Sequence, residues 1–90
     1  MVLNEKQIQT NLNQLPGWEY NDDYLVKTYK FSDFKASLTF VNSVGDLAEE
    51  ANHHPDIVIQ YHNVKLSLRS HDEDGITDKD FDLAGKIEKL

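Results

Sequence analysis

The sequence predicts an α+β domain in which a four-stranded antiparallel sheet is covered on one face by helices. Two pairs of short strand-like segments alternate with three segments of helical periodicity, which gives the order α-β-β-α-β-β-α. Short polar turns join the strands of each pair, so neighbouring strands are expected to run antiparallel. A chain of 90 residues supports one core, and we expect a single domain over residues 1–90.

The first helix and the first hairpin follow from local signals. Asn4 and Gln7 have the spacing of a capping box, and the helical pattern after them stops at Pro16-Gly17. Aromatic and β-branched residues are then frequent over 18–31, which predicts two strands around a turn at 21–23.

The second helix is predicted to start after Ser32 as N-cap and to end near Asn52. Gly45 in its interior costs about 1 kcal/mol relative to alanine, so we expect close approach of the sheet or of another subunit there. The apolar positions of this helix are expected on one face: Phe34, Leu38, Val41, Val44, Ala48 and Ala51.

The second hairpin is expected to have strands over 57–61 and 64–70 around a two-residue turn at His62-Asn63. Apolar and polar residues alternate in the second of these strands, so one of its faces is buried. Asp80 follows Thr77 at capping-box spacing and opens a final helix.

Composition excludes several classes of function. Sixteen acidic against nine basic side chains give a formal charge of -7, which disfavours direct binding to nucleic acid. The absence of cysteine excludes thiol chemistry and cysteine-type zinc sites. We expect a cytoplasmic protein without a membrane segment, because neither a signal peptide nor a long apolar run is present. A small core without disulfides favours a homo-oligomer.

Three histidines are candidates for catalysis. His53 and His54 precede the third strand, His71 follows the fourth, and a turn at His62-Asn63 places His54 opposite His71. Imidazoles with a pKa near ~6.5 provide a proton donor and an acceptor at neutral pH, as elimination or hydration reactions require. From spacing alone, the alternative that these histidines are solvated surface residues is the favoured one.

Other polar residues near the histidines have simpler explanations. Glu49, Asp72 and Asp80 are expected near enough to orient the rings or shift their pKa, although Asp80 also serves the capping box. His62 is explained by its turn. Adjacent histidines in extended chain point to opposite sides, and no metal-ligand spacing is present, so we expect no metal site and no cofactor.

Read as one unit, a set of spaced residues resembles the signature of the pterin-4a-carbinolamine dehydratases. The similarity extends to Pro16-Gly17-Trp18, to the long middle helix and to residues 80–84, and therefore covers nearly the whole chain. The residues that carry it are Glu49, His53, His54, Pro55, Tyr61, His71 and Asp80.

The resemblance implies an enzyme that removes water from a 4a-hydroxytetrahydropterin to give the quinonoid dihydropterin, a recycling step after aromatic amino-acid hydroxylation. It implies proton transfer by His53 and His71, substrate contact by His54, no metal or cofactor, and a homodimer or homotetramer. The supporting positions are Glu49, Asn52 and Asp80.

Two positions depart from the family pattern. Asn52 stands where aspartate is frequent and carries no charge, and Lys79 stands where arginine is common and lacks bidentate geometry. Two alternative functions also follow from the resemblance: a dimerisation cofactor that binds a homeodomain transcription factor, and a related role in molybdopterin metabolism.

Overall fold

A computed structural model describes residues 1–90 and has the predicted order of helices and strands. None of its helices is both long enough and apolar enough to cross a lipid bilayer. The elements are α1 (Glu5–Leu12), β1 (Glu19–Asn21), β2 (Tyr24–Lys30), α2 (Phe34–Ala51), β3 (Asp56–Gln60), β4 (Asn63–Leu68), the short 3-10 helix η1 (His71–Glu73) and α3 (Asp78–Glu88).

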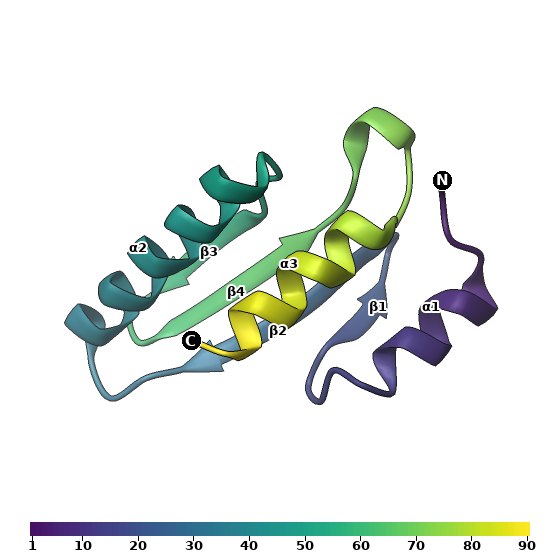
Figure 1. Ribbon diagram of the computed structural model, residues 1–90. Helices are drawn as coiled ribbons and strands as arrows, with labels where there is room; N and C mark the ends of the chain where they lie inside the picture. The colour runs from purple at the N-terminus through teal and green to yellow at the C-terminus, as the bar shows by residue number, and fades with distance from the viewer.

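The four strands form one antiparallel sheet in the order β1-β2-β4-β3, with β4 in its interior. Figure 1 shows α2 and α3 lying across the same face of this sheet, with α1 beside β1. Side chains buried on β4 alternate with more exposed ones, as the sequence pattern predicts. The expected α+β architecture is confirmed.

Helix caps agree with the prediction at two of three starts. Capping boxes form at Asn4 and at Thr77, each with its partner three residues on. The predicted cap of α2 is wrong: Asp33, not Ser32, accepts a hydrogen bond from the Ala36 amide at 2.8 Å. A carboxylate at the N-terminus of a helix also interacts favourably with the helix dipole.

The two hairpin turns differ in how well the sequence predicts them. The first lies at Asp22 and Asp23, both with positive φ, as a tight two-residue hairpin requires. The second lies at Tyr61 and His62 rather than at His62-Asn63, because Asn63 continues β4 and pairs with strands on both sides. The ladder with β2 therefore sets the position of this turn.

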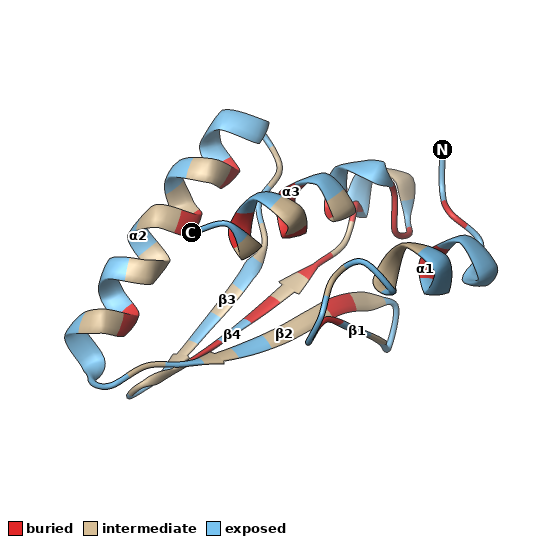
Figure 2. Cartoon of the chain, turned by 60° about the horizontal axis from the view of Figure 1, so that its bottom comes forward, coloured by how far each residue is buried: buried red, intermediate tan, exposed pale blue.

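The core lies between the sheet and the helices, and Figure 2 shows its buried positions on the inner sides of α2, α3 and β4. The predicted inner face of α2 is partly wrong, since Phe34 and Leu38 are 48% and 39% exposed, whereas Ser37 is buried with Val44 and Ala48. The inner face is thus rotated around the helix axis relative to the predicted one. Gly45 has open space around its Cα, so no close approach within the chain explains it.

A polar cluster ties the C-terminal end of α3 to the sheet. The Glu88 carboxylate accepts hydrogen bonds from the Trp18 indole at 3.2 Å, from Lys27 Nζ at 2.8 Å and from the Tyr29 hydroxyl. Burial acts to raise the pKa of the Glu88 carboxyl, but these donors outweigh it and hold that pKa below its usual value. The ionised carboxylate therefore stabilises the fold.

This cluster predicts an acid-sensitive contribution to stability. Because the folded pKa of Glu88 is below the ordinary value of 4.5, its contribution is present above that pH and is lost as the pH falls through the folded pKa. We expect Glu88→Gln to lower the free energy of unfolding at pH 7 by roughly 1 to 3 kcal/mol, with a smaller loss at pH 3. Urea denaturation at both pH values measures this, with the exposed Asp82→Asn on the same helix as control. An equal loss at both values would contradict the role given to the charge.

Candidate active site

The predicted catalytic residues gather in a hollow at one end of the sheet. Figure 1 shows the C-terminal end of α2, the start of β3 and η1 at this end. The hollow has a volume of about 320 Å³. It is lined by Asn52, His53, His54, Arg69, His71, Asp72 and Lys79.

The most ordered part of this hollow is the pair His53 and Asp80. His53 Nε2 lies 2.5 Å from Asp80 Oδ1, and the His53 side chain is only 11% exposed. Asp80 is fully buried, and its other oxygen accepts hydrogen bonds from the Ser70 hydroxyl and the Thr77 amide, both at 2.9 Å. Since an ionised carboxylate only accepts hydrogen bonds, His53 donates through Nε2 and keeps Nδ1 free.

This arrangement gives Asp80 both of the roles that the sequence suggests. As the third residue of the α3 capping box, it is fixed at the helix N-terminus, where a negative charge is favourable. As the partner of His53, it fixes the orientation of that ring and the nitrogen that faces the carboxylate. The buried carboxylate thus holds the His53 imidazole in one orientation beside the hollow.

His54 has a different and weaker partner. Its Nε2 contacts the Glu49 carboxylate, but both side chains are exposed to solvent and Glu49 does not line the hollow. An exposed pair of this kind contributes little to stability. Glu49 therefore supports His54, which lies five residues further along the chain, and does not contact the His53–Asp80 pair.

The predicted pairing of His54 with His71 is wrong in register, although both rings line the same hollow. Asp56 pairs with Ser67, and continuing this register by two residues places Arg69 across from His54. The first reason is that the turn between β3 and β4 lies one residue earlier than predicted. The second is that His71 is not part of the sheet but the first residue of η1. His71 is exposed, and no hydrogen bond holds its ring.

Some residues of the site carry weaker sequence signals. Asn52 caps α2 in the left-handed conformation. Both Asn52 and Lys79, at the start of α3, line the hollow. Ser70 is not among the predicted site residues, although it falls on the apolar side of the alternation in the fourth predicted strand, where a buried polar residue needs a hydrogen-bond partner. Arg69 has no stronger signal than its place on the polar side of that strand.

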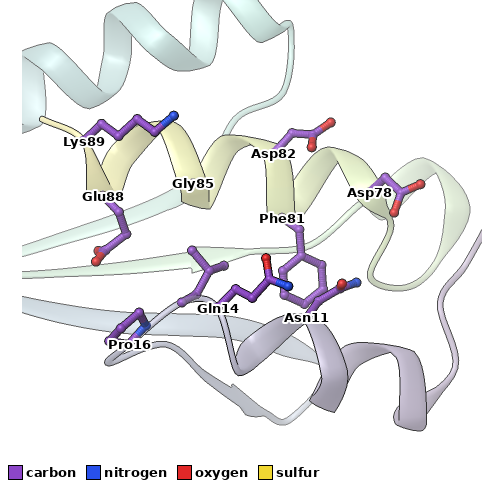
Figure 3. A pocket seen from close by; sticks show the side chains of 10 residues that line it. Asn11, Gln14, Pro16, Asp78, Phe81, Asp82, Gly85, Glu88 and Lys89 are labelled. Carbon is purple, nitrogen blue, oxygen red and sulfur yellow. The ribbon is translucent and has the colours of Figure 1, made fainter.

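A larger hollow of about 450 Å³ lies between α1 and α3 (Figure 3). Its polar side chains are amides, carboxylates and one lysine, and it contains no histidine. It therefore lacks the groups that exchange protons readily at neutral pH. Across the whole chain, no three His, Asp or Glu side chains converge in a way that could hold a metal ion.

A known protein family matches this chain along its full length. The sequence profile of the family described as "Pterin 4 alpha carbinolamine dehydratase" matches residues 1–90. The chain belongs to this family. The resemblance seen in the histidine signature is confirmed over the full length of the sequence.

Similar proteins named for pterin-4a-carbinolamine dehydratase activity align with nearly the whole chain. A protein of Sulfolobus acidocaldarius is 43% identical, covering 100% of this chain and 99% of its own, and one of Thermomicrobium roseum is 48% identical, covering 98% and 95%. Both are provisionally named pterin-4-alpha-carbinolamine dehydratase. A crystal structure from Brucella melitensis described as "transcriptional coactivator/pterin dehydratase" has a TM-score of 0.94 at 30% identity, covering 99% of this chain and 97% of that one.

Proposed function

We propose that this chain is a 4a-hydroxytetrahydropterin dehydratase that works by histidine acid/base catalysis. The observation that carries the proposal is the buried Asp80 carboxylate, which orients His53 toward a hollow that His71 shares. Family membership supports the same reaction. The product would be the quinonoid dihydropterin, and the reaction would serve pterin recycling after aromatic amino-acid hydroxylation.

The elimination needs two proton movements. The N5 electron pair forms the C4a=N5 bond as the C4a–O bond breaks, a proton joins the leaving hydroxyl to give water, and the N5 proton is lost. One imidazolium and one neutral imidazole meet these needs. We assign this pair to His53 and His71, whose rings differ in environment: one is held by a buried carboxylate, the other is exposed.

The remaining residues of the hollow are assigned to substrate binding and support. His54 and Asn52 line the hollow beside His53 and offer hydrogen bonds to the pterin ring, whose edge carries several donors and acceptors. Glu49 supports His54 through its contact with Nε2. These contacts would act on ground state and transition state alike, so they are expected to affect KM more than kcat.

Turnover is expected to need no metal. Imidazoles can protonate a hydroxyl leaving group and deprotonate N5 without a Lewis acid. Dehydration of a synthetic 4a-hydroxytetrahydropterin, followed by stopped-flow absorbance, should therefore proceed at the same catalysed rate before and after exhaustive dialysis against EDTA. Loss of the rate on chelation and its return with one divalent ion would show that the histidines act as metal ligands.

We further propose that the chain forms a homodimer or homotetramer. Apolar side chains of α2 remain exposed at Phe34 and Leu38, and Val58 is 48% exposed on β3. β3 is an edge strand that pairs with β4 on one side and has no partner strand on the other. Covering these positions would add to a small core. Light scattering at micromolar concentration should give a mass of two or four chains, and a strictly monomeric mass would contradict this assembly.

A protein-binding role is the second candidate, because the similar Brucella melitensis protein is described as a transcriptional coactivator as well as a pterin dehydratase. The turnover assay separates the two functions. A folded chain that leaves the dehydration at its uncatalysed rate would favour binding, whereas a saturable increase in rate supports the enzyme.

A further inference from the structure

A chain of contacts beside the proposed catalytic hollow has no part in the proton transfers proposed above. It runs from Arg69 at the end of β4 to Tyr24 at the start of β2, and from there to His71. Leu25 pairs with Leu68, so Tyr24 and Arg69 lie one step further along, opposite each other on the sheet face away from the helices. The sequence places them far apart, and the hairpins bring them together.

The first link joins Tyr24 to His71. Their ring centroids are 5.9 Å apart at an interplanar angle of 64°, an edge-to-face contact. The rings of His53 and His54 are each held by a carboxylate, but no hydrogen bond holds the ring of His71. The edge-to-face contact with Tyr24 therefore restricts the orientation of this imidazole.

The second link joins Arg69 to Tyr24 and to two neighbouring loops. The Arg69 guanidinium lies 5.9 Å from the Tyr24 ring centroid. It donates to the Asp23 carbonyl oxygen at 3.0 Å and to the Asp74 carboxylate at 2.6 Å, and its side chain is only 14% exposed. Arg69 thus connects the β1–β2 turn to the loop that carries His71.

The two residues that Arg69 contacts, Asp23 and Asp74, both have an unusual backbone conformation. Asp23 and Asp74 each have positive φ, at 70° and 57°, a conformation that residues other than glycine adopt infrequently. The loop that carries His71 is closed by a bridge between Ser70 and Gly75, next to the Asp74 anchor. A planar guanidinium can hold two such anchors at once, which a lysine ammonium on a flexible stem does less well.

We propose that Tyr24 is a positioning residue for His71, and that Arg69 holds Tyr24 and the η1 loop in the arrangement that His71 needs. The assignment of proton transfer to His71 rests on the function proposed above. The contact between the two rings does not. The proposal can therefore be tested both with and without turnover.

The kinetic arm compares Tyr24→Leu with Tyr24→Phe. An edge-to-face contact of ordinary strength corresponds to about 3 to 10-fold in an equilibrium, so Tyr24→Leu should lower kcat by about 3 to 10-fold with KM unchanged. Tyr24→Phe keeps the ring and should retain the parental kcat. Arg69→Lys should lower kcat similarly, and the double variant Tyr24→Leu/Arg69→Lys should lose less than the product of the two single effects.

The matched control is Tyr20→Leu, which removes a tyrosine from the same hairpin. Tyr20 bonds to Asp23 through its hydroxyl and makes no ring contact with His71. It should leave kcat unchanged. A fall equal to that of Tyr24→Leu would show a general effect of the hairpin and overturn the proposal.

The spectroscopic arm needs no activity. The proton NMR signals of the His71 ring, assigned by their absence in His71→Ala, should be displaced by the ring current of Tyr24. Tyr24→Leu should move them toward their random-coil positions, whereas Tyr24→Phe and Tyr20→Leu should not. Unchanged His71 signals in folded Tyr24→Leu overturn the positioning role, even if the parent proves inactive; an inactive parent with the expected shifts overturns only the proposed function.

Discussion

His53→Ala and His71→Ala are each expected to lower the catalysed dehydration rate by roughly 100 to 10,000-fold, the usual contribution of a positioned general acid or base. Both rings face the same hollow, and His53 is held by a buried carboxylate. If the two histidines act on one proton-transfer step, the double variant should lose less than the product of the single effects. The rates are measured with a 4a-hydroxytetrahydropterin after circular dichroism has shown each variant to be folded.

His62→Ala is the matched control for these two variants. His62 lies in the β3–β4 turn, at the other end of the hairpin, and its Nδ1 makes no hydrogen bond. Its loss should leave the rate nearly unchanged, while His54→Ala should mainly raise KM. A His62→Ala rate as low as that of His53→Ala would point to a general effect of losing a histidine.

Asp80→Asn is expected to lower kcat by roughly 100-fold, because it removes the carboxylate charge that orients His53 and keeps the shape of the Asp80 side chain. It should also destabilise the protein by about 1 to 3 kcal/mol, since an amide cannot accept all the hydrogen bonds that the buried carboxylate accepts. Steady-state kinetics and urea denaturation of the same preparation measure the two effects separately.

The control for Asp80 is Asp78→Asn. Asp78 is an exposed acidic residue in the first turn of the same helix, so its substitution removes an equal charge from the helix N-terminus without touching His53. It should leave kcat unchanged. If Asp80→Asn turned over at the parental rate, the buried pair would be structural, and His53 would need another explanation.

The sequence predicts those parts of the fold that depend on local signals. The capping boxes at Asn4 and Thr77 and the turn at Asp22-Asp23 are confirmed because each depends on a few adjacent residues. The turn at Tyr61 is not predicted, because a tyrosine with positive φ is unfavourable by itself and is accepted only to extend the ladder between β2 and β4. The inner face of α2 depends in the same way on how the helix lies over the sheet.

The site likewise has some residues that the sequence indicates and others that depend on contacts between distant segments. Spacing alone favours solvated surface histidines, so the three histidines and Asp80 are proposed as site residues from the family resemblance. The structure brings the histidines to one hollow and places Asp80 against His53. Ser70 completes the hydrogen bonding of Asp80, and Arg69 reaches two loops through contacts between distant segments. Such contacts depend on strand register, and the earlier turn between β3 and β4 displaces the register that the sequence suggests.

The measurement that tests the central claim most directly compares the parent chain with the folded double variant His53→Ala/His71→Ala on one 4a-hydroxytetrahydropterin. The parent should accelerate dehydration in proportion to its concentration, and the double variant should leave the reaction close to its uncatalysed rate. Equal acceleration by both proteins would contradict histidine catalysis in this hollow.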